Sequence, residues 1–394
     1  MWDFPYGREE KKKYLLDAVV SVKDIVALGG EESNKLGTLP QETVDALYKA
    51  GLFAMKLPRE AGGAEADPVT QIEVIEALSY INASVGWCVM IGATAVGWPA
   101  AFLPEKGFNI AFGEGVVPKC VTVSLPAGST ELIENTGDGY VVTGRWPYAS
   151  GARHSEWIGA GIRMPDENSE LGWKQMYAFF PTKQATIHDN WDVVGLRGTG
   201  SCDVSLDKTF VPSEFIYDVV DSRNLRGGPL YLLGRPGFVI NEHAGLALGI
   251  ARRALDEIVK IAKSKRRRID PNTIAERSVF QRVVGELDLK LRATRHLCLD
   301  VFENAWNTVS TGEVPSHEQQ NEMRATSLYA TEIALDVVTK AFRYAGGSAL
   351  HEGQVLQECL RDMNAAAQHF MVTDAAYESH GQTLLDISET LAKV

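Results

Sequence analysis

The chain has 394 residues, 45% of them hydrophobic and 23% charged, which is the composition of a soluble globular protein with two or three packed units. Its formal net charge of −12 disfavours a sequence-independent grip on nucleic acid or on an anionic membrane, because both need a cationic surface. The five cysteines form no CxxC pair, so we expect neither a zinc ribbon nor a disulfide framework. The N-terminus lacks the apolar run of a signal peptide, and no stretch approaches the roughly 20 uncharged apolar residues of a membrane span, so we expect a reduced, cytoplasmic protein.

The first third of the chain is predicted to be helical. Apolar residues recur at helical spacing over residues 39–57, before a turn that ends in Gly62-Gly63, and a second amphipathic helix opens at Pro68. Residues 83–102 carry almost no charge, which predicts a helix that is buried on most faces. Its glycine and proline content favours a core helix over a membrane span.

The middle of the chain, between residues 118 and 212, consists of short runs rich in Val, Thr, Ile, Tyr and Phe. These runs predict strands over residues 120–124, 140–146, 156–162, 176–180 and 203–206. Thr136–Gly139, with the sequence TGDG, is typical of a hairpin turn. We therefore predict an all-β insertion between helical regions.

After residue 237 the chain is predicted to be helical again. Residues three and four apart form one stripe suited to near-antiparallel helix packing, namely Val284, Leu287, Leu291, Thr294, Cys298, Val301 and Ala305. A coiled coil would show the same stripe, but the other long helices make a four-helix bundle the simpler account. The predicted division is a helical domain at 1–117, a β-domain at 118–228 and a helical bundle at 229–394, in a mainly α protein.

Several motifs, in order along nearly the whole chain, resemble those of one family. They are Leu57–Gly63, Ser124–Ser129, Trp191–Ser201 followed by Phe210–Pro212, Phe342–Gly347 and Arg361-Asp362. Together they resemble the acyl-CoA dehydrogenase superfamily. The resemblance implies an N-terminal helical domain, a β-barrel-like middle domain and a C-terminal four-helix bundle, with the loop at Ser124 beside a flavin.

The segment after Arg361-Asp362 departs from the dehydrogenase pattern. A dehydrogenase needs a carboxylate base near the α-carbon of an acyl thioester, and in the commonest group a glutamate follows this pair. Here the sequence RDMNAAAQHF has no carboxylate at that place and offers His369 instead. Glu242 lies near the position of the glutamate that other dehydrogenases carry on a bundle helix, but about one helical turn away. An acyl-CoA dehydrogenase with Glu242 as a relocated base therefore stays an alternative.

A second departure is Gly144–Trp157, with the sequence GRWPYASGARHSEW. It resembles the W-x-(F/Y)-x-S-G block of two-component flavin monooxygenases of the same fold, such as hydroxyphenylacetate, dibenzothiophene and indole oxygenases. Those relatives also place a histidine after the Arg-Asp pair, as His369 stands here. The resemblance implies insertion of one oxygen atom from O2 into a small aromatic or heteroaromatic substrate, indole-like compounds included, through a flavin C4a-hydroperoxide.

Reduced FAD or reduced FMN is the cofactor that the resemblance implies. A separate NAD(P)H-dependent flavin reductase is expected to supply it, because the chain has no nicotinamide-binding motif. No metal-binding motif is present either, so no metal is expected. A non-catalytic ligand-binding relative that keeps the fold is a third alternative.

His369 and Ser150 are the catalytic residues that the resemblance implies. A hydroxyl such as Ser150 can both donate to and accept from the N5 region of a flavin. The reference pKa of histidine suits His369 to taking a proton from the substrate or to a hydrogen bond with the peroxide. Without the resemblance, a histidine in an Ala-rich helix and a serine before glycine in a turn would both be interpreted as structural.

Further residues are assigned to the flavin and the substrate by the same resemblance. Trp146 and Tyr148 are expected to wall the flavin ring. The expected substrate pocket draws on residues of the apolar helix and of the C-terminal half, with core packing as the alternative role of the helix residues: Cys88, Ile91, Trp98, His243 and Phe370.

The distal part of the cofactor is assigned to a neighbouring subunit. One family segment touches the cofactor's diphosphate and adenine across a subunit boundary, and it is resembled here by Phe280-Gln281 and Arg266–Arg268. The resemblance implies a homotetramer. It also places Arg268, Phe280 and Gly346-Gly347 at the cofactor. Without the resemblance, the basic run 265–268 would be a solvated helix end. Arg343 stands where many dehydrogenases carry a glutamine, so FAD and FMN both stay open, with FAD slightly favoured.

Overall fold

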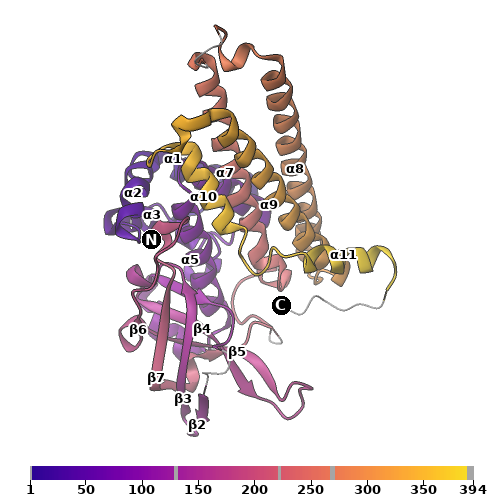
Figure 1. Cartoon of the computed structure of the whole chain (residues 1–394). Coiled ribbons are helices and arrows are strands. Elements are labelled where there is room, and N and C mark those ends of the chain that lie inside the picture. The colour runs from indigo at the N-terminus through magenta and orange to yellow at the C-terminus, as the bar shows by residue number, and fades with distance from the viewer. Residues whose placement is uncertain (1, 128–131, 221–222, 267–270, 388–394) are drawn as a thin grey trace. The chain divides into compact units, whose positions relative to one another are not determined.

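The structure is a computed structural model that describes residues 2–127, 132–220, 223–266 and 271–387 (Figure 1). The chain divides into two compact units: Met1–Asp67, Trp87–Asp192 and Arg197–Gly234 form the first, and Pro68–Gly86, Val193–Leu196 and Arg235–Val394 form the second. This division differs from the predicted division at residues 117 and 228. The change in composition at residue 118 marks a change of secondary structure, since the N-terminal helices and the strands share one unit.

The helices of the first unit are α1 (Arg8–Ser21), α2 (Lys23–Leu36), α3 (Gln41–Lys49), most of α5 (Ala83–Phe102) and α6 (Glu105–Phe112). The helix predicted over residues 39–57 ends at Lys49, because Gly51 adopts a left-handed φ of 79° that stops it. Helix α5 is long and apolar enough to cross a membrane by composition, but 94% of its most apolar stretch is buried inside the protein, as in a core helix.

Two four-stranded sheets complete the first unit. One has the order β1-β4-β5-β8 and the other β2-β3-β7-β6, and all described pairs are antiparallel except β1 with β4. The predicted TGDG hairpin is confirmed between β2 and β3, where the Thr136 amide donates to the Gly139 carbonyl. The five predicted strands are confirmed, and the strands are β1 (Cys120–Val123), β2 (Leu132–Asn135), β3 (Gly139–Ala149), β4 (Trp157–Pro165), β5 (Trp173–Pro181), β6 (Thr186–Ile187), β7 (Cys202–Pro212) and β8 (Ile216–Tyr217).

Trp146 joins the two sheets. Its side chain on β3 is completely buried, and its indole N–H donates to the carbonyl oxygen of Gly161 on β4 at 2.8 Å. Gly161 cannot carry a side chain, because a Cβ there would lie 2.4 Å from the carbonyl oxygen of Ser124. One tryptophan and one glycine thus fix the spacing of β3, β4 and the loop after β1.

The second unit is a helical bundle, as predicted. Figure 1 shows its long helices α7, α8 and α9 running side by side, and the sequence-predicted stripe from Leu287 to Ala305 is buried along α8. The helices of the unit are α4 (Pro68–Ile81), α7 (Gly237–Ser264), α8 (Ser278–Ser310), α9 (His317–Ala345), α10 (Val355–Ala366) and α11 (Ala375–Leu384).

Helices α4 and α7 pack at backbone distance. A Cβ on Gly245 would lie 2.5 Å from the Ile72 carbonyl oxygen, and one on Gly249 would lie 2.3 Å from that of Glu76. Any side chain at these two positions would push the helices apart. The buried first turns of α7 therefore sit directly against α4.

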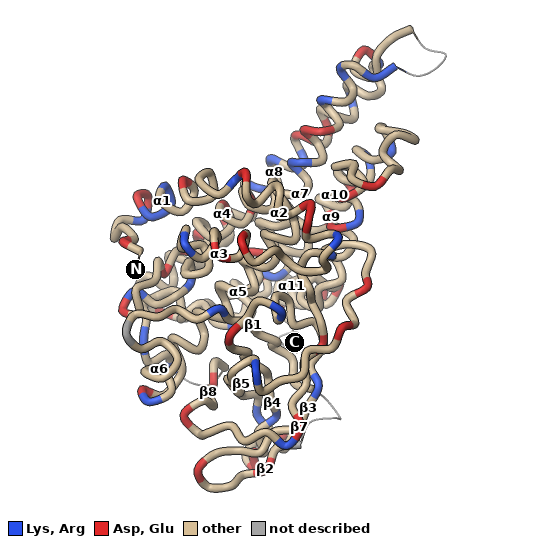
Figure 2. The backbone as a smooth tube through the Cα atoms, turned by 90° about the vertical axis from the view of Figure 1, so that its left-hand side faces the viewer, with Lys and Arg blue, Asp and Glu red and all other residues tan. Residues whose placement is uncertain are grey.

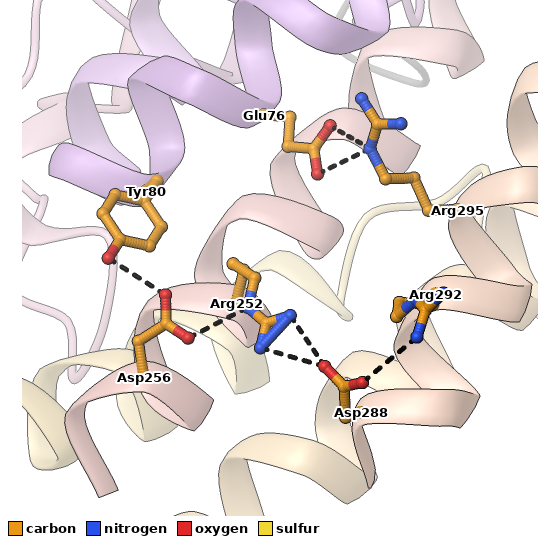
Figure 3. A network of polar contacts seen from close by, with 7 residues as sticks. All are labelled: Glu76, Tyr80, Arg252, Asp256, Asp288, Arg292 and Arg295. Carbon is orange, nitrogen blue, oxygen red and sulfur yellow. Dashed lines mark hydrogen bonds and ion pairs between the residues drawn. The ribbon is translucent and has the colours of Figure 1, made fainter. Parts of the chain in front are cut away.

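Ion pairs link the outer faces of α4 and α7 to α8 (Figure 3). Arg295 on α8 reaches Glu76 at 2.8 Å and Glu73 at 2.9 Å on α4. Arg252 on α7 bridges Asp256 and Asp288, both at 3.1 Å. Figure 2 shows acidic and basic residues interleaved along α7 and α8, in keeping with this pairing.

Two of the motifs that carry the family resemblance meet inside the second unit. The carboxylate of Asp362 on α10 accepts the backbone N–H of Leu196 at 2.7 Å. Gly195 lies so close to α10 that a Cβ would fall 2.1 Å from the Arg361 carbonyl oxygen. Burial, reinforced by the nearby Glu358 carboxylate, raises the pKa of Asp362 to about 7.

We expect Asp362 to make stability fall as the pH rises. Its pKa in the folded state lies above its value of 3.8 in the unfolded chain, so its stabilising contribution is complete below that value and is lost as the pH rises through about 7. Between pH 5.5 and 8 the loss should be on the order of 2 kcal/mol of unfolding free energy. Chemical denaturation of the wild type and of Asp362→Asn at both pH values measures it.

The Asn variant keeps an acceptor for the Leu196 amide but cannot titrate, so its pH slope should be smaller than that of the wild type. Asp362→Ala removes the acceptor and should lower stability at both pH values by about 1–3 kcal/mol. An unchanged slope in Asp362→Asn would contradict the assignment.

Candidate functional site

A bulge in β3 separates Trp146 from Ser150. Trp146 pairs with Val204 on β7, but Ala149 already pairs with Cys202, so β3 carries one extra residue between them. Tyr148 lies in this bulge with a left-handed φ of 65°. The bulge breaks the strict alternation of the strand, because an extra residue shifts every later side chain to the other face.

The two aromatic residues expected to wall a flavin therefore have different surroundings. Trp146 has no exposed surface and its ring lies in the core between the sheets, while its assignment to the flavin wall stays a prediction. The Tyr148 ring is 70% exposed and meets the Trp191 ring edge-on, with ring centroids 6.4 Å apart. Of the pair, Tyr148 alone has a ring surface available to a ligand.

Ser150 stands at the end of a buried chain of hydroxyl groups. Its Oγ accepts the indole N–H of Trp87 at 2.9 Å and lies 2.7 Å from the Oγ of Ser201. The Ser201 Oγ in turn lies 2.7 Å from the Oγ1 of Thr199. The Thr199 carbonyl accepts the backbone N–H of Gly151 at 2.9 Å, which fixes this segment against the turn at Ser150.

Sequence reasoning missed the partners of Ser150. Thr199 and Ser201 lie inside the quoted block Trp191–Ser201, and Trp87 precedes Cys88 in the apolar helix. No spacing rule connects three segments so far apart in sequence. Two buried hydroxyl-bearing residues within a glycine-rich turn were the available signal, because buried hydroxyls need partners.

The other predicted residues of the first unit lie on α5 and in the loop after β1. Cys88 is buried beside the Thr199 carbonyl, and burial raises the pKa of its thiol, so it stays protonated. Trp98 is also buried and packs on Tyr177, with ring centroids 5.4 Å apart, while Ile91 is half-buried. Ser124 is half-buried, and its carbonyl accepts the Gln175 amide at 2.5 Å.

In the second unit, His369 lies just beyond the end of α10, beside His243 of α7. The two rings have centroids 5.5 Å apart, and Phe370 follows at 4.7 Å from the His369 ring. The carbonyl oxygen of Ala366, the last residue of α10, accepts both the Nε2–H of His243 and the backbone N–H of His369, each at 3.1 Å. Three predicted residues therefore form one cluster.

The segment that carries His369 is held from a second side. The buried Arg324 of α9 donates from Nε to the Met371 carbonyl at 3.0 Å, and the Val372 amide donates to the His369 carbonyl at 3.0 Å. An irregular stretch fixed at both ends presents its side chains in one arrangement. Glu242, the base in the dehydrogenase alternative, is completely buried next to His243 on α7.

Both histidines are held neutral. Burial lowers the pKa of His243 to about 4, against the opposing effect of its bond to Ala366. Burial and the neighbouring His243 lower the pKa of His369 to about 3, although part of the His369 side chain is exposed, because its Nδ1 atom is buried. A neutral imidazole can accept a proton at one nitrogen and donate from the other.

The residues predicted for the distal part of the cofactor lie at the far end of the bundle. Phe280 is buried against Tyr344, with ring centroids 5.2 Å apart, whereas Gly346 and Gly347 are exposed after α9. A cavity of about 390 Å³ nearby is lined by Arg277, Val279, Val283, Lys340, Arg343 and Tyr344. Arg268, Gly128 and Ser129 lie outside the described residues.

No group of three or more His, Cys, Asp or Glu side chains within the described ranges could hold a metal ion. Ser150 belongs to the first unit and His369 to the second, and each cluster is defined within its own unit.

Two family models match the chain. The acyl-CoA dehydrogenase N-terminal domain matches residues 9–103, and the acyl-CoA dehydrogenase C-terminal domain matches residues 242–374. The structure of XiaF from Streptomyces sp. in complex with FADH2 and glycerol superposes with a TM-score of 0.86 at 23% identity, over 96% of each chain. The predicted fold class is thereby confirmed.

Curated relatives align over almost the full length. Indole-3-acetate monooxygenase of Pseudomonas putida is 27% identical, over 93% of this chain and 91% of the relative. The flavin-dependent monooxygenase oxygenase subunit HsaA of Rhodococcus jostii is 26% identical, over 86% of this chain and 89% of the relative. The similarity to flavin-dependent monooxygenases predicted from the SG block and His369 is confirmed.

We expect neither His243 nor His369 to take up a proton between pH 6 and pH 8, because burial disfavours the charged imidazolium. Their lowered pKa values also mean that their contribution to stability is present above about pH 6.5 and is lost as the pH falls toward 4. A histidine-detected NMR titration, assigned with His243→Phe and His369→Ala, measures both. A midpoint for either ring near roughly 6.5 would refute this assignment.

Proposed function

Because the chain belongs to the acyl-CoA dehydrogenase family, and because its aligned relatives are flavin-dependent monooxygenases, we propose that it is the oxygenase component of a two-component flavin monooxygenase. It uses reduced flavin and O2 to hydroxylate a small aromatic or heteroaromatic substrate. The observation that carries the proposal is the neutral imidazole of His369 in the second unit, in a segment without a carboxylate between Met363 and Thr373. The first unit separately offers the buried hydroxyl of Ser150.

The described residues fit a flavin in their donor chemistry. Ser150 offers a hydroxyl whose oxygen is anchored by the indole N–H of Trp87, and Tyr148 offers an exposed ring of the kind that packs against planar ligands. The cavity is lined by the guanidinium groups of Arg277 and Arg343, of the kind that bind phosphate, and by Lys340, whose ammonium is paired with Asp336 at 2.8 Å. A bound reduced flavin would supply the activation of dioxygen, and the protein supplies binding, orientation and the exclusion of water.

His369 is assigned the proton chemistry. A neutral imidazole accepts a hydrogen bond from a phenolic hydroxyl or an indole N–H, which makes the ring more electron-rich and more easily oxygenated. His243 fixes the end of α10 through the Ala366 carbonyl and so helps to orient His369. Phe370, whose ring lies beside that of His369, is assigned to apolar contact with the substrate.

The cofactor is FAD rather than FMN in this proposal. The two guanidinium groups at the cavity, Arg277 and Arg343, suit a diphosphate better than the single phosphate of FMN, since Lys340 is paired with Asp336. Measurement of FAD and FMN affinities side by side, with Arg343→Ala as the variant, tests the choice of FAD over FMN.

The proposal also includes a separate reductase protein as partner, a homotetramer as the oligomer and the cytoplasm as the place where the chain works.

The proposed activity predicts incorporation of one atom from O2 into the product. The chain is mixed with NADH, a separate flavin reductase, FAD or FMN, and a panel of phenols and indoles under isotope-labelled dioxygen. Mass spectrometry should find one labelled oxygen in the product. Reduction of bound oxidised flavin by a panel of acyl-CoA thioesters, with no oxygenated product, would instead favour the Glu242 dehydrogenase alternative.

The His369→Ala variant separates chemistry from binding. It should lower product formation by about 100-fold or more, as loss of a general base does, while hydrogen peroxide release rises. Flavin affinity should stay as in the wild type. A loss of flavin binding in His369→Ala would make His369 a structural residue.

A further inference from the structure

The hydrogen bonds around Ser150 constrain what its hydroxyl can do. An indole N–H is only ever a donor, so the 2.9 Å contact from Trp87 permanently occupies one of the two lone pairs of the Ser150 Oγ. One lone pair and one proton remain. The Oγ of Ser201, at 2.7 Å, takes one of these two, and either atom can be the donor.

Ser201 is placed between two hydroxyls at equal distance. It lies 2.7 Å from Ser150 and 2.7 Å from the Oγ1 of Thr199, and all three side chains are at most 6% exposed. The three hydroxyl groups can therefore donate in either of two directions along this row. In one, protons run from Ser150 to Ser201 to Thr199; in the other they run from Thr199 to Ser201 to Ser150.

Each arrangement gives the Ser150 hydroxyl a different hydrogen-bonding role toward a ligand. When Ser150 donates to Ser201, its second lone pair is free and the hydroxyl accepts a bond from a ligand. When Ser201 donates to Ser150, both lone pairs are filled and the hydroxyl must donate outward. A flavin needs both, because N5 carries a hydrogen in the reduced state and a lone pair in the oxidised state.

We propose that Ser201 is a positioning residue that reverses the hydroxyl chain, so that Ser150 accepts from reduced flavin and donates to oxidised flavin. The inference rests on the proposed function, because it assumes that Ser150 faces the flavin. Without Ser201, oxidised flavin still receives the Ser150 proton. Reduced flavin leaves that proton buried without an acceptor, which is costly.

The variants test the two arrangements separately. Ser201→Ala should weaken binding of reduced flavin relative to oxidised flavin by roughly tenfold, the order expected for one unsatisfied buried donor. Thr199→Val keeps the side-chain shape, removes the outer partner of Ser201 and should shift the ratio in the same direction by less. Trp87→Phe removes a donor that serves both arrangements and should leave the ratio unchanged.

The measurement is an anaerobic titration of each apoprotein with oxidised and with dithionite-reduced FAD and FMN, followed by protein fluorescence. Melting temperatures establish that each variant is folded. The expected pattern is a shifted ratio of dissociation constants in Ser201→Ala and Thr199→Val only. An unchanged ratio in both variants, or an equal shift in Trp87→Phe, overturns the inference. A wild type that binds neither state overturns the proposed function itself.

Discussion

The hydrogen bond from the Trp146 indole to the Gly161 carbonyl is the constraint on which the hydroxyl cluster depends. It fixes β3 to β4 across the two sheets, so the strand cannot slide when the bulge at Tyr148 interrupts its register. Beyond that fixed point the chain exposes Tyr148 and buries Ser150 against Trp87. A large aromatic ring in the core thus helps to position a small polar group just beyond the end of the same strand.

The histidine cluster depends on an equivalent constraint in the helical unit. Gly245 and Gly249 let α7 approach α4 at backbone distance, which takes the first turns of α7 out of solvent. His243 is buried there and loses its charge, and its remaining N–H is directed to the last carbonyl of α10. Desolvation and hydrogen bonding act together. Burial keeps both imidazoles neutral, and the shared Ala366 carbonyl fixes the position of the His369 backbone.

Polar groups in both clusters are retained inside the protein at a cost in desolvation, which marks them as more than packing residues. A core built for stability alone would use apolar side chains at positions such as Thr199, Ser201 and His243. Flavin chemistry gives a reason for keeping them, since the cofactor changes its hydrogen-bonding pattern with its redox state and the substrate must lose a proton. Asp362 is different in kind: its carboxylate serves the Leu196 backbone and so belongs to the scaffold.

The sequence by itself determined the fold class, the helix at 83–102, the five main strands and the stripe on α8, because these follow from local periodicity and burial. It also predicted Ser150 and His369 as site residues, through short motifs. Tertiary structure alone decided that Trp146 is a core residue and Tyr148 an exposed one, because a bulge shifts the side-chain alternation without leaving a local signal. It likewise decided the partners of the two predicted residues, Trp87 and Ser201 for one and His243 for the other. Hydrogen bonds between segments up to 123 residues apart are set by packing and not by any pattern along the chain.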